Sequence, residues 1–188
     1  YQQPWWRDAK IFFDFAARLG KVLAEGEQRP TTLVIHPEGS AWHLGCEDEY
    51  TGKTHRIRDI DDAFMKGAVR TLERKHILYH FGDEQMMARL GSVEGTHLRV
   101  GEMTYEYLVI PENAGLLPST ERLIDDFRRA GGKIVSADEH PVNPVCPENC
   151  LTYTYRHYDD FDVHYFVNTF GDECECECAV GNLVLDLV

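Results

Sequence analysis

The feature that most constrains the fold is a set of short apolar runs that alternate with helical patterns. The first run, residues 31–35, is Thr-Thr-Leu-Val-Ile, and a continuous run of this kind is typical of a strand buried on both faces of a parallel sheet. Comparable runs occur at residues 76–81, 105–111 and 133–136. Strands that alternate with helices at these lengths predict βαβ units, with helices on both faces of the sheet.

Periodic apolar residues mark the first helix. Residues 4–26 carry apolar side chains at three- and four-residue spacings, with Pro4 suited to the first turn and Gly26 to the end. These side chains share one face: Phe12, Phe15, Leu19, Val22 and Leu23.

Further helices are expected between the strands. Residues 43–58 are polar and rich in charge, which indicates an exposed loop, and a helix is predicted over 59–75. A short helix over 83–90 is followed by a small hairpin arm at 96–101. Ser119 is predicted to be the N-cap of a further helix, which ends at Gly131 and Gly132.

The pattern changes after residue 140. Three prolines fall within residues 140–147, and no helical pattern separates the four strand-like runs that follow, at residues 151–156, 162–168, 173–180 and 183–188. This pattern is typical of antiparallel strands joined by turns. We therefore predict an α/β domain with a doubly wound parallel sheet over residues 1–140, and an antiparallel β segment over 141–188 that covers an edge or begins a β-sandwich.

Charge excludes some partners. The net charge is −13, from 32 acidic and 19 basic residues, and such a surface repels nucleic acid and anionic membranes. No apolar run reaches the roughly 18 residues of a membrane span. The chain begins with Tyr1 and has no signal peptide, as expected of a piece of a longer protein, so its localisation stays open, with cysteine usage slightly favouring the cytoplasm.

The cysteines are predicted to be reduced and structural. Cys174, Cys176 and Cys178 alternate with glutamates, which is a strand pattern with one apolar face. Same-face residues on a strand lie about 6.5–7 Å apart, whereas sulfurs on one zinc lie about 3.7–3.8 Å apart. The triplet therefore cannot share one ion, and although one member could join Cys146 and Cys150, we predict no metal site. Cys46 is the sixth cysteine of the chain and is likewise predicted to be reduced.

Several short motifs are spaced over roughly residues 4–170: Pro4-Trp5-Trp6, His36-Pro37-Glu38-Gly39-Ser40-Ala41-Trp42, Gly82-Asp83-Glu84, Val93-Glu94-Gly95, Leu98-Arg99-Val100-Gly101, Tyr105 to Pro111, Gly131-Gly132-Lys133, and Tyr153-Tyr155-Arg156 with Val163 to Asn168. Together these motifs resemble the class I amidotransferase-like domain of large glycoside hydrolases. They are similar to α-L-rhamnosidase-like enzymes and to the β-galactosidase trimerisation domain.

The resemblance implies a flavodoxin-like fold and a carbohydrate-active parent from bacteria. In such parents the catalytic carboxylates lie in an upstream (β/α)₈ barrel, and a β-sandwich follows downstream. A barrel needs about 250 residues, so this chain cannot contain one. The acidic pairs Asp61-Asp62, Asp125-Asp126 and Asp159-Asp160 are predicted to be solvent-facing.

The residues that should carry chemistry in this fold are missing from their expected places. A class I amidotransferase has a cysteine on a sharp elbow after a strand, but residues 111–118 contain no nucleophile. A flavodoxin binds the FMN phosphate in the loop after its first strand. Here Pro37 lacks an N–H and Glu38 would repel the phosphate. We therefore predict no catalytic residue and no cofactor.

The loop after the first strand remains the candidate contact site. Open α/β sheets bind ligands at the carboxyl ends of their strands. Four residues there, His36, Glu38, Ser40 and Trp42, could offer hydrogen bonds and a stacking face to a sugar or an interface. The alternative is structural, with Ser40 capping a helix and Trp42 packing on Trp5 or Trp6.

The expected function is therefore a non-catalytic accessory domain of a multidomain glycoside hydrolase. It would brace the upstream barrel and the downstream sandwich of the same polypeptide, and it could line a substrate cleft or a subunit interface, which leaves a homo-oligomer open. One alternative is a stand-alone sugar-binding or protein-interaction module that uses exposed tryptophans. Another is a hydrolase of the amidotransferase-like fold.

Overall fold

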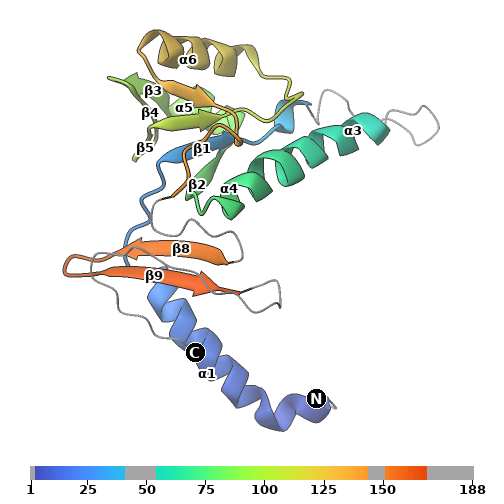
Figure 1. The fold of residues 1–188 in the computed structure, drawn as a ribbon, viewed down its shortest axis with the longest axis vertical. Coiled ribbons are helices and arrows are strands. Elements are labelled where there is room, and N and C mark those ends of the chain that lie inside the picture. The colour runs from blue at the N-terminus through green and yellow to red at the C-terminus, as the bar shows by residue number, and fades with distance from the viewer. Residues whose placement is uncertain (1–2, 41–53, 144–150, 169–188) are drawn as a thin grey trace.

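A computed structural model describes residues 3–40, 54–143 and 151–168 (Figure 1). At its centre is a parallel sheet of four strands, in the order β2-β1-β6-β7. This is the order in which the first four strands of a flavodoxin-like sheet are arranged, and the predicted α/β fold with a doubly wound parallel sheet is confirmed. The strands are β1 (Thr32–Ile35), β2 (Tyr79–Gly82), β6 (Tyr107–Val109) and β7 (Lys133–Val135).

Both faces of the sheet are buried, as the continuous apolar run predicted. Leu33 and Ile35 of β1 point to one face, where they pack with residues of α5 (Glu84–Leu90) and α6 (Pro118–Arg129) such as Met87 and Phe127. Val34 points to the other face and packs on the long helix before β2. Each large apolar side chain buried in this way stabilises the fold by about 1.5–3 kcal/mol.

The long helix begins earlier than the sequence pattern indicated. It consists of α3 (Thr54–Asp61), the π-helical segment η3 (Asp62–Val69) and α4 (Arg70–Arg74). The prediction of a loop up to residue 58 was therefore wrong for residues 54–58, because this polar first part of the helix has no apolar stripe to reveal it. Residues 41–53 lie outside the described residues.

A small antiparallel sheet follows α5. It contains β3 (Gly91–Glu94), β4 (His97–Val100) and β5 (Met103–Tyr105) in that order. The β3–β4 turn uses Gly95 with φ +59°, a backbone conformation that glycine adopts without a steric penalty. Leu98 of β4 is fully buried against the core. The hairpin arm predicted at residues 96–101 is thus confirmed, and it forms part of the core.

Helix α6 begins one residue before the predicted N-cap. Its N-cap is Leu117, and Pro118 occupies the first turn, so the prediction of Ser119 as the N-cap was wrong. Proline favours this position because its fixed φ suits the helix and its missing N–H would have had no partner there. The predicted end is confirmed, since Gly131 has φ +86° and the Gly132 N–H bonds to the Phe127 carbonyl at 2.9 Å.

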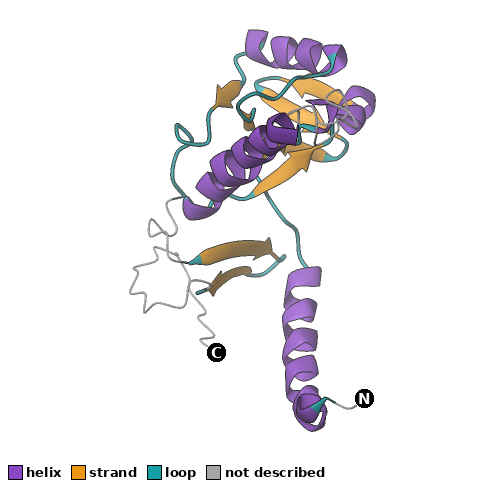
Figure 2. Cartoon of the chain, turned by 90° about the vertical axis from the view of Figure 1, so that its right-hand side faces the viewer, coloured by secondary structure: helices purple, strands orange, loops and turns teal. Residues whose placement is uncertain are grey.

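The first helix extends away from the sheet (Figure 2). A 3₁₀ turn, η1 (Pro4–Asp8), leads into α1 (Ala9–Ala24), and Gly26 with φ +72° follows its end, as predicted. Although the apolar spacing predicted a helix that packs, Phe12 is 64% exposed. No helix in the described residues is both long and apolar enough to cross a bilayer.

The two C-terminal strands that the structure describes form a hairpin. β8 (Thr152–His157) and β9 (Asp162–Val167) pair antiparallel, as predicted. Glu27 forms an antiparallel bridge with His157, and the Tyr158 hydroxyl donates to the Val22 carbonyl of α1 at 2.7 Å. The strands predicted after residue 168 lie outside the described residues, and both the domain boundary near residue 140 and the sandwich remain predictions.

Candidate functional site at the carboxyl end of the sheet

The candidate residues follow β1, next to the point where the strand order reverses. The chain passes from β1 to β2 on one side and later enters β6 on the other side. Between the carboxyl ends of β1 and β6 lies the position where open α/β sheets bind ligands. Residues 36–40 after β1 and residues 110–117 after β6 border this position.

Residues 38–40 after β1 are helical and not a loop as expected, and Ser40 connects this helical turn to the loop after β6. Its buried hydroxyl donates to the Gly115 carbonyl at 2.9 Å and accepts a hydrogen bond from the Gly115 N–H. A hydroxyl that is engaged as both donor and acceptor has little left to offer a ligand. Ser40 therefore holds the two sides of the switch point together and does not cap a helix through these bonds.

Glu84 makes a second connection across this edge. It is the first residue of α5, it is only 1% exposed, and its Oε2 accepts the Leu117 N–H at 2.6 Å. Within the described residues Oε1 has no hydrogen-bond partner. Gly39 lies against that oxygen, because a Cβ added there would stand 2.6 Å from it. A buried carboxylate thus lies between the helical turn after β1 and the loop after β6.

Sequence reasoning did not single out Glu84 as a site residue. It appears in the sequence only as the last residue of the Gly82-Asp83-Glu84 motif, and an acid in the first turn of a helix is ordinarily solvent-facing. Its neighbour fits that expectation, because the Asp83 side chain caps α5 by accepting the Met86 N–H at 2.6 Å. Glu84 is instead buried where Leu117, from a distant loop, and Gly39 both approach its carboxylate.

His36 and Glu38 lie together at the same edge. His36 Nδ1 is 3.3 Å from Glu38 Oε1, and both side chains are partly exposed. The His36 ring packs edge-on against Phe64, with 4.9 Å between ring centroids. These two predicted residues therefore form a polar pair at the rim, whereas Ser40 is directed at the loop after β6. The fourth, Trp42, lies outside the described residues.

The chemistry of this edge is unsuited to a phosphate. A phosphate site in this fold needs backbone N–H groups and no nearby negative charge. Here the Glu84 carboxylate takes the Leu117 N–H, and Glu38 adds a second acid at the rim. Residues 110–117 contain no cysteine, serine or threonine, and Asn113 has φ +61°, so this loop turns without the nucleophile of an amidotransferase elbow.

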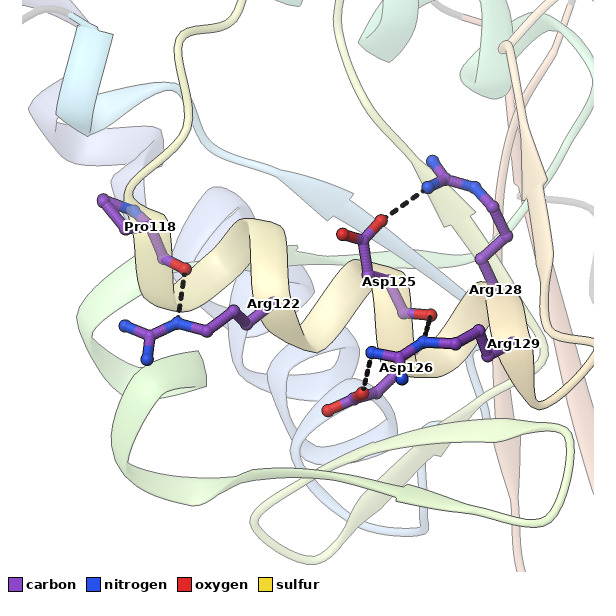
Figure 3. Close-up of polar contacts among 6 residues, drawn as sticks. All are labelled: Pro118, Arg122, Asp125, Asp126, Arg128 and Arg129. Atoms are coloured by element: carbon purple, nitrogen blue, oxygen red, sulfur yellow. Dashed lines mark hydrogen bonds and ion pairs between the residues drawn. The ribbon is translucent and has the colours of Figure 1, made fainter.

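The acidic pairs named above face solvent, as predicted. On α6, Asp125 pairs with Arg128 and Asp126 pairs with Arg129, each at 2.7 Å (Figure 3). Exposed pairs of this kind contribute about 0.3–0.5 kcal/mol each. Asp61-Asp62 and Asp159-Asp160 are likewise exposed. Within the described residues no three potential metal ligands come together, and all six cysteines lie outside the described residues.

A second polar cluster joins the hairpin to the sheet. His80 Nδ1 lies 2.9 Å from the Tyr105 hydroxyl, and its Nε2 lies 3.2 Å from the Gln28 amide. The Gln28 nitrogen donates to His80, while its oxygen accepts from Arg156 of β8 at 3.2 Å. Burial lowers the pKa of His80, and the Arg156 charge lowers it further. The neutral ring therefore accepts from Gln28 and donates to Tyr105.

Comparison with known proteins adds nothing to the α/β fold described above. Neither a scan against protein-family models nor a search of curated proteins gives a match for this sequence.

Proposed function

We propose that this chain is a non-catalytic accessory domain of a multidomain glycoside hydrolase. In this proposal the domain braces the catalytic (β/α)₈ barrel against a downstream β-sandwich and contributes a subunit interface. The motifs that resemble such enzymes support a glycoside hydrolase as the parent protein. The arrangement of side chains at the carboxyl edge of the sheet supports a role without catalysis.

The observation that carries the proposal is the pair of connections across the switch point. Ser40 bonds to Gly115, and Glu84 bonds to Leu117. In an enzyme of this fold the same position must stay open for substrate and must present a nucleophile or a base. Here Ser40 and one oxygen of Glu84 are each engaged by the segment after β6, while the other Glu84 oxygen is buried beside Gly39. In this proposal Ser40 and Glu84 therefore stabilise the domain, and His36 and Glu38 are the polar pair that remains at the rim.

The first test is activity of the purified chain. Aryl glycosides with several sugars, and glutamine as an amide substrate, should give no turnover above a buffer blank. A steady rate that disappears in Glu84→Gln or Ser40→Ala would overturn the proposal and favour a hydrolase of the amidotransferase-like fold.

The second test uses the complete reading frame from which the chain derives. Trp42→Ala and Ser40→Ala in that full-length protein should leave kcat/KM for its glycoside unchanged, while Ser40→Ala lowers its thermal stability. A fall in kcat/KM of about tenfold or more for Trp42→Ala would instead place the loop after β1 in a substrate cleft. A reading frame with no barrel would contradict the proposal outright.

One observation favours a second candidate, a stand-alone interaction module. The N-terminal helix exposes Trp5 and Phe12 at 55% and 64%, and large exposed apolar groups mark contact surfaces. A sugar-binding module would bind oligosaccharides through such rings. Titration of the purified chain with oligosaccharides, followed by tryptophan fluorescence, separates that candidate from the scaffold proposal, which predicts no change.

A further inference from the structure

Helix α1 presents an apolar seam that the described residues leave largely uncovered. Phe12, Phe15 and Val22 are 64%, 38% and 37% exposed, and Leu19 is half-buried. The four residues follow one another at spacings of three, four and three. This is the spacing of the a and d positions in a coiled coil, in which each seam packs against another helix with the same spacing.

We infer that this seam, Phe12-Phe15-Leu19-Val22, is a subunit interface that pairs α1 with α1 of a second copy, in antiparallel orientation. The inference specifies the interface within the proposed function, but it stands on the geometry of α1 alone. A second copy fits because a two-fold axis brings one seam onto an identical seam and needs no further acceptor surface.

Side-chain size supports the antiparallel orientation. With the two helices centred on each other, Phe12 lies opposite Val22 of the second copy, and Phe15 lies opposite Leu19. Each layer of the pair then combines one ring with one aliphatic side chain, and alternating large and small residues fill a helix interface well. In a parallel pair, each phenylalanine would instead lie opposite the same phenylalanine of the second copy.

Charge supports the same orientation. The chain carries a net charge of −13, and α1 is the part that extends away from the α/β domain (Figure 2). Its 16 residues span about 24 Å, well beyond the roughly 8 Å over which physiological salt screens charge. An antiparallel pair places the two acidic domains at opposite ends, whereas a parallel pair would place them side by side.

The neighbouring basic residue predicts how the dimer responds to salt. Arg18 lies beside the seam, and in the antiparallel pair the two copies of Arg18 face each other near the two-fold axis. Salt screens this repulsion and that between the domains. The dimer should therefore tighten as salt is raised. Docking of α1 on an acidic protein or an anionic membrane would weaken under the same change.

The test is sedimentation of the purified chain over a range of concentrations. Because the seam is short, we expect a reversible dimer with a Kd in the micromolar range, tightening about two- to fivefold between about 0.05 and 0.5 M NaCl. Phe15→Glu and Leu19→Glu should each weaken the dimer about tenfold or more. Ala17→Glu is the matched control, since Ala17 lies on the opposite side of α1 and is exposed. It should leave the dimer intact.

Three results would overturn the inference. The first is a wild-type chain that stays monomeric up to about 0.2 mM. The second is a dimer that Phe15→Glu and Leu19→Glu leave unchanged while circular dichroism shows the helix intact. The third is a monomer that sediments with phosphatidylserine vesicles, which would make α1 a membrane contact. The tests of the proposed function are the activity of the purified chain and the content of its complete reading frame. Neither depends on whether α1 forms a dimer, so the two proposals can fail independently.

Discussion

The buried carboxylate of Glu84 accepts the Leu117 N–H at 2.6 Å, which ties the start of α5 to the loop before α6. The other oxygen of this carboxylate lies against Gly39 in the helical turn after β1. Three segments that are distant in the sequence therefore meet at one side chain, and the stability of this edge should depend on it.

Replacement of Glu84 tests that dependence. Glu84→Ala removes the acceptor of the Leu117 N–H and leaves a gap, so we expect a loss of about 1–3 kcal/mol in the free energy of unfolding. Glu84→Gln keeps an acceptor oxygen and should lose less. Urea unfolding measures both, with Glu112→Ala as the exposed control, expected to stay within about 0.5 kcal/mol of wild type. Equal stability of Glu84→Ala and wild type would contradict this role.

Ser40→Ala should weaken the neighbouring connection. The variant removes both hydrogen bonds to Gly115, and we expect a loss of about 1 kcal/mol, since the Gly115 groups can partly turn to water. Hydrogen exchange should rise locally at the Gly115 amide. Ser92→Ala on β3 is an exposed serine control and should alter neither quantity. A Gly115 amide that exchanges at the wild-type rate in Ser40→Ala would show that the bond is not formed in solution.

Two glycine substitutions should have opposite signs. Gly39→Ala places a methyl group 2.6 Å from Glu84 Oε1, so the carboxylate must move and the domain should lose about 1–3 kcal/mol. Gly20→Ala lies within α1, where nothing stands within 4 Å of the added methyl. There the higher helix propensity of alanine should raise helix stability by about 0.5–1 kcal/mol. Thermal unfolding of both variants measures the contrast, and a stabilising Gly39→Ala would contradict the tight approach to Glu84.

Stability should fall as the solution is acidified below about pH 6.5, the ordinary histidine pKa. Burial is the main cause that lowers the pKa of His80 and of His140, whose Nε2 lies 2.8 Å from the Thr32 hydroxyl. As the pH drops, these two histidines therefore bind protons in the unfolded chain before they do so in the folded chain. The unfolded state is therefore favoured until the folded histidines also titrate.

Paired variants isolate this effect. In His80→Gln and His140→Gln the difference in urea midpoint between about pH 7.5 and pH 5.5 should be smaller than in the wild type. His97→Gln is the control, because His97 is exposed at the start of β4. A wild-type chain whose midpoint does not change over this range would show that the two rings are protonated without loss of structure.

The parallel sheet was predictable because its signal is local. Residues 31–35 end in three consecutive apolar residues and are rich in β-branched side chains, and a run this short with this composition favours a strand buried on both faces. The start of the long helix was missed because residues 54–58 carry charge and lack an apolar stripe. The first residue of α6 was missed because Ser119 is a good cap in isolation, whereas Pro118 and the loop before it determine the actual start.

The candidate site was only partly predictable. Its location after β1 follows from the topology of open sheets, and His36 and Glu38 do lie together there. The partners of Ser40 and Glu84 come from a loop 75 and 33 positions away. A single sequence contains no local sign of such contacts, since they depend on how the loop after β6 crosses the edge.

The bond from Tyr158 to Val22 has a consequence for how the chain acquires its structure. It joins residues 136 positions apart, so during synthesis α1 leaves the ribosome long before the hairpin that meets its end exists. Contacts between such distant residues form late in folding, because the intervening chain must first be ordered. Until the hairpin is made, the carboxyl end of α1 therefore lacks the contact that Tyr158 provides in the folded chain.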